Sequence, residues 1–145
     1  MKKILLLSLV VLGATFNTKA QEACEELPQI CEKSLAPTLE DPSLYISDGQ
    51  VYRAFIDEGQ EAEFSATLYG GSRYRIAATA GSKDNYVIFE IRDIDGEVLF
   101  SNVDHANAPY WDFEIQNDIE CFIVMKLDED KRDSGCATML IGFKK

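Results

Sequence analysis

The stretch YVIFEIRDIDGEVLFSN, residues 86–102, holds two short runs with apolar side chains at every second position. Such alternation is typical of a strand that packs one face on a core. Between the runs lies Asp95-Gly96, and because a two-residue hairpin turn needs positive φ, this pair predicts a β-hairpin. The alternating residues are Val87, Phe89 and Ile91 before the turn and Val98 and Phe100 after it.

The same period of two continues along most of the chain. Gly, Asp and Asn turns separate the runs, and the chain shows no internal repeat. This pattern predicts an all-β fold, an antiparallel β-sandwich or jelly roll of about eight strands. The expected strands cover residues 51–56, 61–68, 73–79, 86–92, 97–102, 110–115, 120–127 and 137–143.

The first 20 residues have the features of a secretory signal peptide. Lys2 and Lys3 precede the apolar run 4–16, which is too short to span a membrane, and Ala20 ends a small-residue cleavage site. A lipid anchor on Cys24 is the alternative, but Glu22 does not fit a lipidation signal. We expect residues 1–20 to be removed, 21–44 to form a cysteine-containing segment and 45–145 to form the sandwich domain. The protein is then periplasmic, secreted or on the cell surface.

The expected mature chain is strongly acidic. It keeps 11 basic residues against 25 acidic ones, a net charge of −14, whereas the full chain carries −11. Such a charge argues against nucleic acid or an anionic membrane as partner and suits cations or a basic protein surface. No later stretch is apolar enough to span a membrane, and no cofactor-binding motif is present.

Residues 22–39 follow a roughly helical spacing, and we expect a short helix near 28–35. Four cysteines in a small exported chain predict two disulfides. A helix would hold Cys24 and Cys31 roughly 10 Å apart, and Cys121 and Cys136 are out of register across a predicted hairpin. These arguments favour Cys24–Cys136 with Cys31–Cys121, or the swapped pairing. A local Cys24–Cys31 loop stays open if Pro28 breaks the helix.

Few residues of the chain are candidates for a metal, ligand or catalytic site. Asp93 and Asp95 could hold calcium, but an EF-hand needs further ligands at fixed offsets, so we expect a turn and no metal. The single histidine, His105, lies in a predicted loop with Asn107, close to Tyr110. Tyr110 is expected to point outward and Trp111 into the core, so His105, Asn107 and Tyr110 form the candidate ligand site. No catalytic residues are predicted. Arg73 and Arg75 are expected to pair with Glu61 and Glu63 across a hairpin.

Four segments resemble the bacterial pre-peptidase C-terminal type of β-sandwich, and resemble more closely small exported bacterial proteins with an N-terminal two-cysteine segment. They are GQEAEFSATLYGGSRYRIAATAG (59–81), NYVIFEIRDIDGEVLFSN (85–102), YWDFEIQNDIECFIVMKL (110–127) and CATMLIGFK (136–144). The resemblance implies a jelly roll with a D-x-x-G hairpin and a binding or stabilising role. It carries no catalytic residue.

Three functions are consistent with these features. The first is an exported, non-enzymatic binding module of the cell envelope that recognises a protein or a glycan. The second is an accessory subunit of an outer-membrane or surface complex. The third is a hydrolase that uses His105 or a pair of carboxylates.

Overall fold

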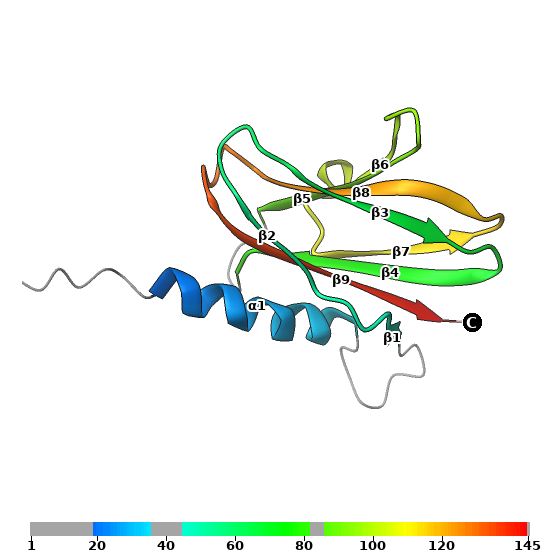
Figure 1. Cartoon of the computed structure of the whole chain (residues 1–145), viewed down its shortest axis with the longest axis horizontal. Helices are drawn as coiled ribbons and strands as arrows, with labels where there is room; N and C mark the ends of the chain where they lie inside the picture. The colour runs from blue at the N-terminus through cyan, green and yellow to red at the C-terminus, as the bar shows by residue number, and fades with distance from the viewer. Residues whose placement is uncertain (1–18, 36–44, 82–85, 145) are drawn as a thin grey trace, which may run out of the picture.

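A computed structural model describes residues 19–35, 45–81 and 86–144, which form one α-helix, a short 3₁₀ helix and two β-sheets. Figure 1 shows how these elements are arranged. Sheet A has the order β1-β9-β4-β7, with β2 also paired to β9; sheet B has the order β3-β8-β5-β6. Sheet A consists of β1 (Ile46–Ser47), β2 (Tyr52–Ile56), β4 (Ser72–Thr79), β7 (Tyr110–Ile115) and β9 (Gly135–Lys144). Sheet B consists of β3 (Ala62–Leu68), β5 (Val87–Arg92), β6 (Val98–Ser101) and β8 (Ile119–Leu127).

The all-β sandwich is confirmed, and each of the eight predicted strands is present, with the two-residue β1 in addition. All the strand pairs are antiparallel. Among the described strands only β5 and β6 are consecutive partners, so the hairpin predicted at Asp95-Gly96 is confirmed. The predicted hairpins of β3 with β4 and of β8 with β9 are wrong, because the chain changes sheet at both turns.

The main core lies between the two sheets. The alternating apolar residues of β4, β5, β8 and β9 point into it, and Phe89, Ile76, Ile123 and Met139 are fully buried there. Burial of such side chains stabilises the fold by roughly 1.5–3 kcal/mol each. The edge strands β2, β3, β6 and β7 contribute half-buried residues, and these border the two open sides of the sandwich.

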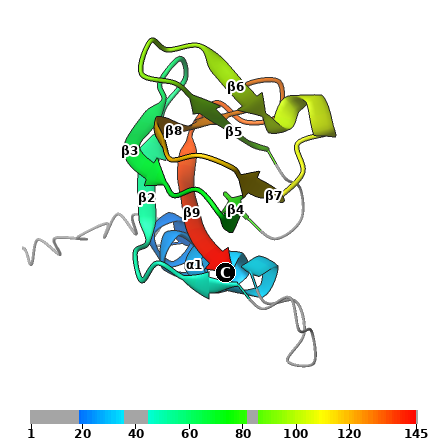
Figure 2. The same ribbon diagram turned by 90° about the vertical axis from the view of Figure 1, so that its right-hand side faces the viewer.

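Helix α1 (Lys19–Leu35) covers the outer face of sheet A, as the end-on view of Figure 2 shows. Leu27, Cys31 and Leu35 are buried at intervals of four residues, and a second core cluster joins Cys31 and Leu35 to β4 and β9. The predicted start near residue 28 is wrong, because the helix continues through Pro28. Proline inside a helix costs about 3 kcal/mol, which packing on the sheet offsets here.

One of the two favoured disulfides is formed. Cys24 and Cys136 are bonded, with Cα atoms 5.5 Å apart, and this bond joins α1 to β9. The predicted Cys31–Cys121 bond is wrong: both thiols are free and buried. Cys31 is on the side of α1 that packs on the outer face of sheet A, whereas Cys121 lies in the core between the sheets. Sheet A therefore separates the two sulfur atoms.

The expected signal peptide lies mostly outside the described residues, which begin at Lys19. Within the part of the chain that is described, no helix combines the length and the apolar character needed to cross a membrane.

Candidate functional site

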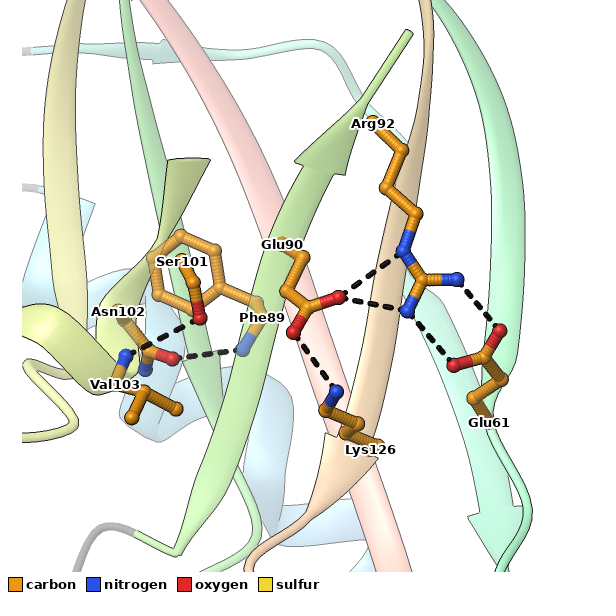
Figure 3. Close-up of polar contacts among 8 residues, drawn as sticks. All are labelled: Glu61, Phe89, Glu90, Arg92, Ser101, Asn102, Val103 and Lys126. Carbon is orange, nitrogen blue, oxygen red and sulfur yellow. Dashed lines mark hydrogen bonds and ion pairs between the residues drawn. The ribbon is translucent and has the colours of Figure 1, made fainter. Parts of the chain in front are cut away.

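The predicted ligand residues lie around η1 (Asn102–His105), a short 3₁₀ turn between β6 and β7. The fully buried side chain of Asn102 fixes this turn to β5. Its Oδ1 accepts a hydrogen bond from the Phe89 backbone N–H at 2.9 Å, as Figure 3 shows. Its Nδ2 donates to the carbonyl oxygens of Val87 and Ala108 at 2.9 and 3.1 Å. The turn is therefore a rigid part of the sandwich.

The three predicted ligand residues do not converge on one surface. His105 is exposed and its ring stacks on Trp111, with ring centroids 3.9 Å apart and planes at 26°. Asn107 is buried, has a left-handed backbone with φ of 52°, and donates to the Asp128 carboxylate at 3.0 Å. Tyr110 points outward, as expected, and Trp111 packs against the core.

No described residue exchanges a hydrogen bond with the His105 imidazole. The imidazole instead contacts two aromatic rings, those of Trp111 and Phe100, and the His105 and Phe100 ring centroids are 5.4 Å apart. A histidine that acts as a base needs a nucleophile and an orienting group within hydrogen-bond reach. The arrangement therefore gives no support to a hydrolase centred on His105.

Tyr110 belongs to a stack on the outer face of sheet A. The Arg75 guanidinium lies 4.4 Å from the centre of the Tyr110 ring and 4.5 Å from that of Tyr45. Arg75 Nε also donates to Asp112 at 2.6 Å and Nη1 to the Ser34 carbonyl at 3.0 Å. The predicted pairing of Arg73 and Arg75 with Glu61 and Glu63 is wrong, because the neighbours of β4 are β7 and β9 and not β3.

Ionised side chains gather on the outer face of sheet B (Figure 3). The Glu90 carboxylate, only 9% exposed, pairs with Arg92 at 2.7 Å and with Lys126 at 2.8 Å, and Arg92 in turn binds Glu61 at 2.7 Å. Burial raises the pKa of Glu90, but hydrogen bonds from Lys126 and Arg92 outweigh that effect and hold the pKa below its usual value. Each member of the cluster has a partner, so the cluster is suited to stabilise the sheet.

Asp93 forms the turn between β5 and β6. Its Oδ1 accepts hydrogen bonds from the backbone N–H groups of Asp95 and Glu97 at 2.9 and 2.8 Å. Gly96 supplies the positive φ of 86° that the turn needs. The described residues contain no cluster of three or more ligands suited to a metal ion. That no tight calcium site exists here stays a prediction.

The sequence did not predict an open groove of about 790 Å³ between the two sheets. It lies on the side where β3 is the edge of sheet B and β1 and β2 complete sheet A (Figure 1). We call it the inter-sheet groove. Its size is within the range of about 300–1,000 Å³ that is typical of ligand sites. Four of its lining residues are aromatic, and these are Tyr52, Tyr69, Tyr74 and Phe143.

Hydrogen bonds hold two of these rings in place. The Tyr52 hydroxyl donates to Asp48 Oδ2 at 2.9 Å, and the Tyr69 backbone N–H donates to the Tyr74 hydroxyl at 2.9 Å. The Tyr69 side chain is 60% exposed at the rim. Next to it, a Cβ on Gly70 would lie 2.7 Å from the Gln116 carbonyl oxygen, so only glycine allows this close approach of the turns.

The comparisons with known proteins bear on the fold. No family model and no curated protein matches this sequence. Among solved structures, the crystal structure of PliG from Aeromonas hydrophila, described as a periplasmic lysozyme inhibitor of g-type lysozyme, has a similar fold with a TM-score of 0.52. The match covers 73% of this chain and 93% of that one at 7% identity, so it concerns the fold alone. The resemblance to pre-peptidase C-terminal domains stays a prediction.

Sequence reasoning could identify parts of the groove but not the groove itself. Tyr52, Tyr74 and Phe143 follow the inward phase of their strands, which predicts core positions. They line a groove because two edges of different sheets leave an opening there. That arrangement depends on the order of the strands in each sheet, which the alternation of apolar and polar residues does not predict.

Proposed function

We propose that this chain is an exported, non-enzymatic module that binds a protein partner at the cell envelope. The observation that carries the proposal is the inter-sheet groove, a preformed concave surface on a rigid sandwich. Specific sites are commonly concave and aromatic with a few placed polar groups, and Asp48 and Tyr52 supply such groups here.

Charge supports a basic partner. The chain carries −11 at pH 7, and a strongly negative surface attracts basic proteins and accelerates their encounter. The fold also occurs in a protein described as a periplasmic inhibitor of lysozyme, so a sandwich of this kind can act by binding another protein. The Cys24–Cys136 disulfide is typical of an exported chain.

The experiment is affinity capture followed by measurement with purified components. The mature chain, immobilised, is incubated with envelope extract of the producing cells, and each captured protein is purified and titrated by calorimetry. We expect saturable binding of a basic protein, weakened by salt. A g-type lysozyme, assayed with and without the chain, is included as one candidate.

Two results would contradict the proposal. In the first, no captured protein binds once it is purified. In the second, the chain hydrolyses an envelope polymer and the His105→Ala variant loses that activity, which would favour the hydrolase.

A further inference from the structure

We propose that the inter-sheet groove accepts the side chain of an arginine from a basic partner protein. The inference rests on the proposed function and specifies the chemistry of its site. It follows from the charges and rings that line the groove and from a contact that the protein already makes elsewhere.

The charge of the groove favours a cation. Asp48 is its one carboxylate, and none of its lining residues is a lysine, arginine or histidine. Burial and the hydrogen bond to Asp48 raise the pKa of Tyr52 to about 12, so this hydroxyl stays neutral and keeps donating. The described residues offer Asp48 no ion pair.

Two cations that are next to lining residues in the sequence point away from the groove. Arg73 and Lys144 are opposite one another on β4 and β9. Tyr74 and Phe143, their neighbours in sequence, belong to the inward face that lines the groove. Because side chains alternate along a strand, Arg73 and Lys144 therefore lie on the outer face of sheet A. Arg73 pairs there with Glu114 at 3.6 Å.

The protein already binds one guanidinium with the same set of groups. The Arg75 guanidinium contacts the rings of Tyr45 and Tyr110, and the Asp112 carboxylate completes the contact. A guanidinium is planar and weakly hydrated, so it stacks on tyrosine rings more readily than a lysine ammonium does. The inter-sheet groove offers tyrosine rings and a carboxylate again, without a resident cation.

The test uses two small peptides and amide chemical shifts of the full mature chain. Acetyl-Gly-Arg-Gly-amide is titrated to millimolar concentration, in parallel with the peptide that has neutral citrulline in place of arginine. We expect the arginine peptide to shift the amides of Leu68, Tyr69 and Gly70, and the citrulline peptide to leave them unchanged. Asp48→Asn should weaken binding about fivefold, since it keeps the hydrogen-bond acceptor but removes the charge.

Matched variants separate the groove from the rest of the surface. Asp95→Asn makes the same charge change in the exposed turn between β5 and β6, and we expect it to bind as the wild type does. Tyr69→Ala should weaken binding about fivefold. Ile94→Ala, which truncates another exposed apolar residue, should leave binding unchanged.

Four outcomes would overturn the inference. Equal binding of the two peptides would show that the groove does not recognise the charge of the arginine side chain. Shifts of the same amides by an N-acetylglucosamine trimer, and not by the arginine peptide, would assign the groove to a glycan. No shift of the groove amides with either peptide would remove the site. If a protein is still captured from envelope extract and Asp48→Asn binds it equally, the proposed function stands and this inference fails.

Discussion

The burial and ion pairing of Glu90 depend on its neighbours in the sheet. It occupies the outward phase of β5, where a solvated carboxylate is expected, yet its side chain is 9% exposed and lies between Arg92 and Lys126. The strand order of sheet B causes this, because β5 and β8 pair Glu90 with Val124 and bring Lys126 beside it. A buried charge of this kind needs all its partners, since removing one leaves another unpaired.

We predict that Glu90→Gln lowers the free energy of unfolding at pH 7 by about 1.5–3 kcal/mol, the usual range for a hydrogen bond to a charged group. The pKa of Glu90 is lowered in the folded state from the ordinary value of 4.5. Its contribution is therefore complete above pH 4.5 and is lost as the pH falls through the folded pKa.

Urea unfolding between pH 7 and pH 3 measures both effects. The acid loss of stability should be smaller in Glu90→Gln than in the wild type, though not absent, because the pKa values of Glu61 and Asp112 are also lowered. Glu63→Gln, at an exposed position of β3, is the control and should change little. An identical acid loss in Glu90→Gln and wild type would contradict the prediction.

At the scale of elements, the Cys24–Cys136 bond attaches a helix to a strand 112 residues away in sequence. Closing a loop of this length stabilises the folded chain by roughly 4–5 kcal/mol in the chain-entropy model. The bond also explains how a helix that contains a proline keeps its position on sheet A.

We predict that the Cys24→Ser, Cys136→Ser double variant loses about 4–5 kcal/mol of unfolding free energy, measured by denaturant titration. The unmodified chain should show two thiols in denaturant without reductant and four after reduction. In the native state both should resist alkylation, because they are buried and burial raises the pKa of Cys31 to about 12. A peptide map with Cys24 bonded to Cys31 would contradict this connectivity.

The turn between β5 and β6 carries a second prediction at this scale. Because Asp93 Oδ1 already accepts two backbone N–H groups, we expect millimolar calcium to leave the melting temperature unchanged. A tight site at 100 times its dissociation constant would add about 2.7 kcal/mol. Asp93→Asn keeps the acceptor and serves as the control. A calcium-dependent rise that this variant abolishes would show a metal site.

At the scale of the whole molecule, removal of the expected signal peptide would set the first residue of the mature chain. We predict that protein recovered from the periplasm or medium begins at Gln21. Intact-mass measurement checks this, and a full-length or lipid-modified mass would contradict it. Cleavage after Ala20 leaves Cys24 in place, so the mature chain can still form the bond between α1 and β9.

The sequence by itself determined the number, type and approximate limits of the main strands. Local alternation of apolar residues and turn chemistry are sufficient for that, as the hairpin at Asp95-Gly96 shows. It also determined the acidic net charge, because that charge follows from composition alone.

Only the tertiary structure decided which strands pair, and therefore where side chains meet. Arg75 pairs with Asp112 and not with Glu61, and Cys31 is separated from Cys121 by a sheet. The inter-sheet groove depends on the same choice. Strand order is set by how the faces of all the strands are buried together, which no single segment encodes.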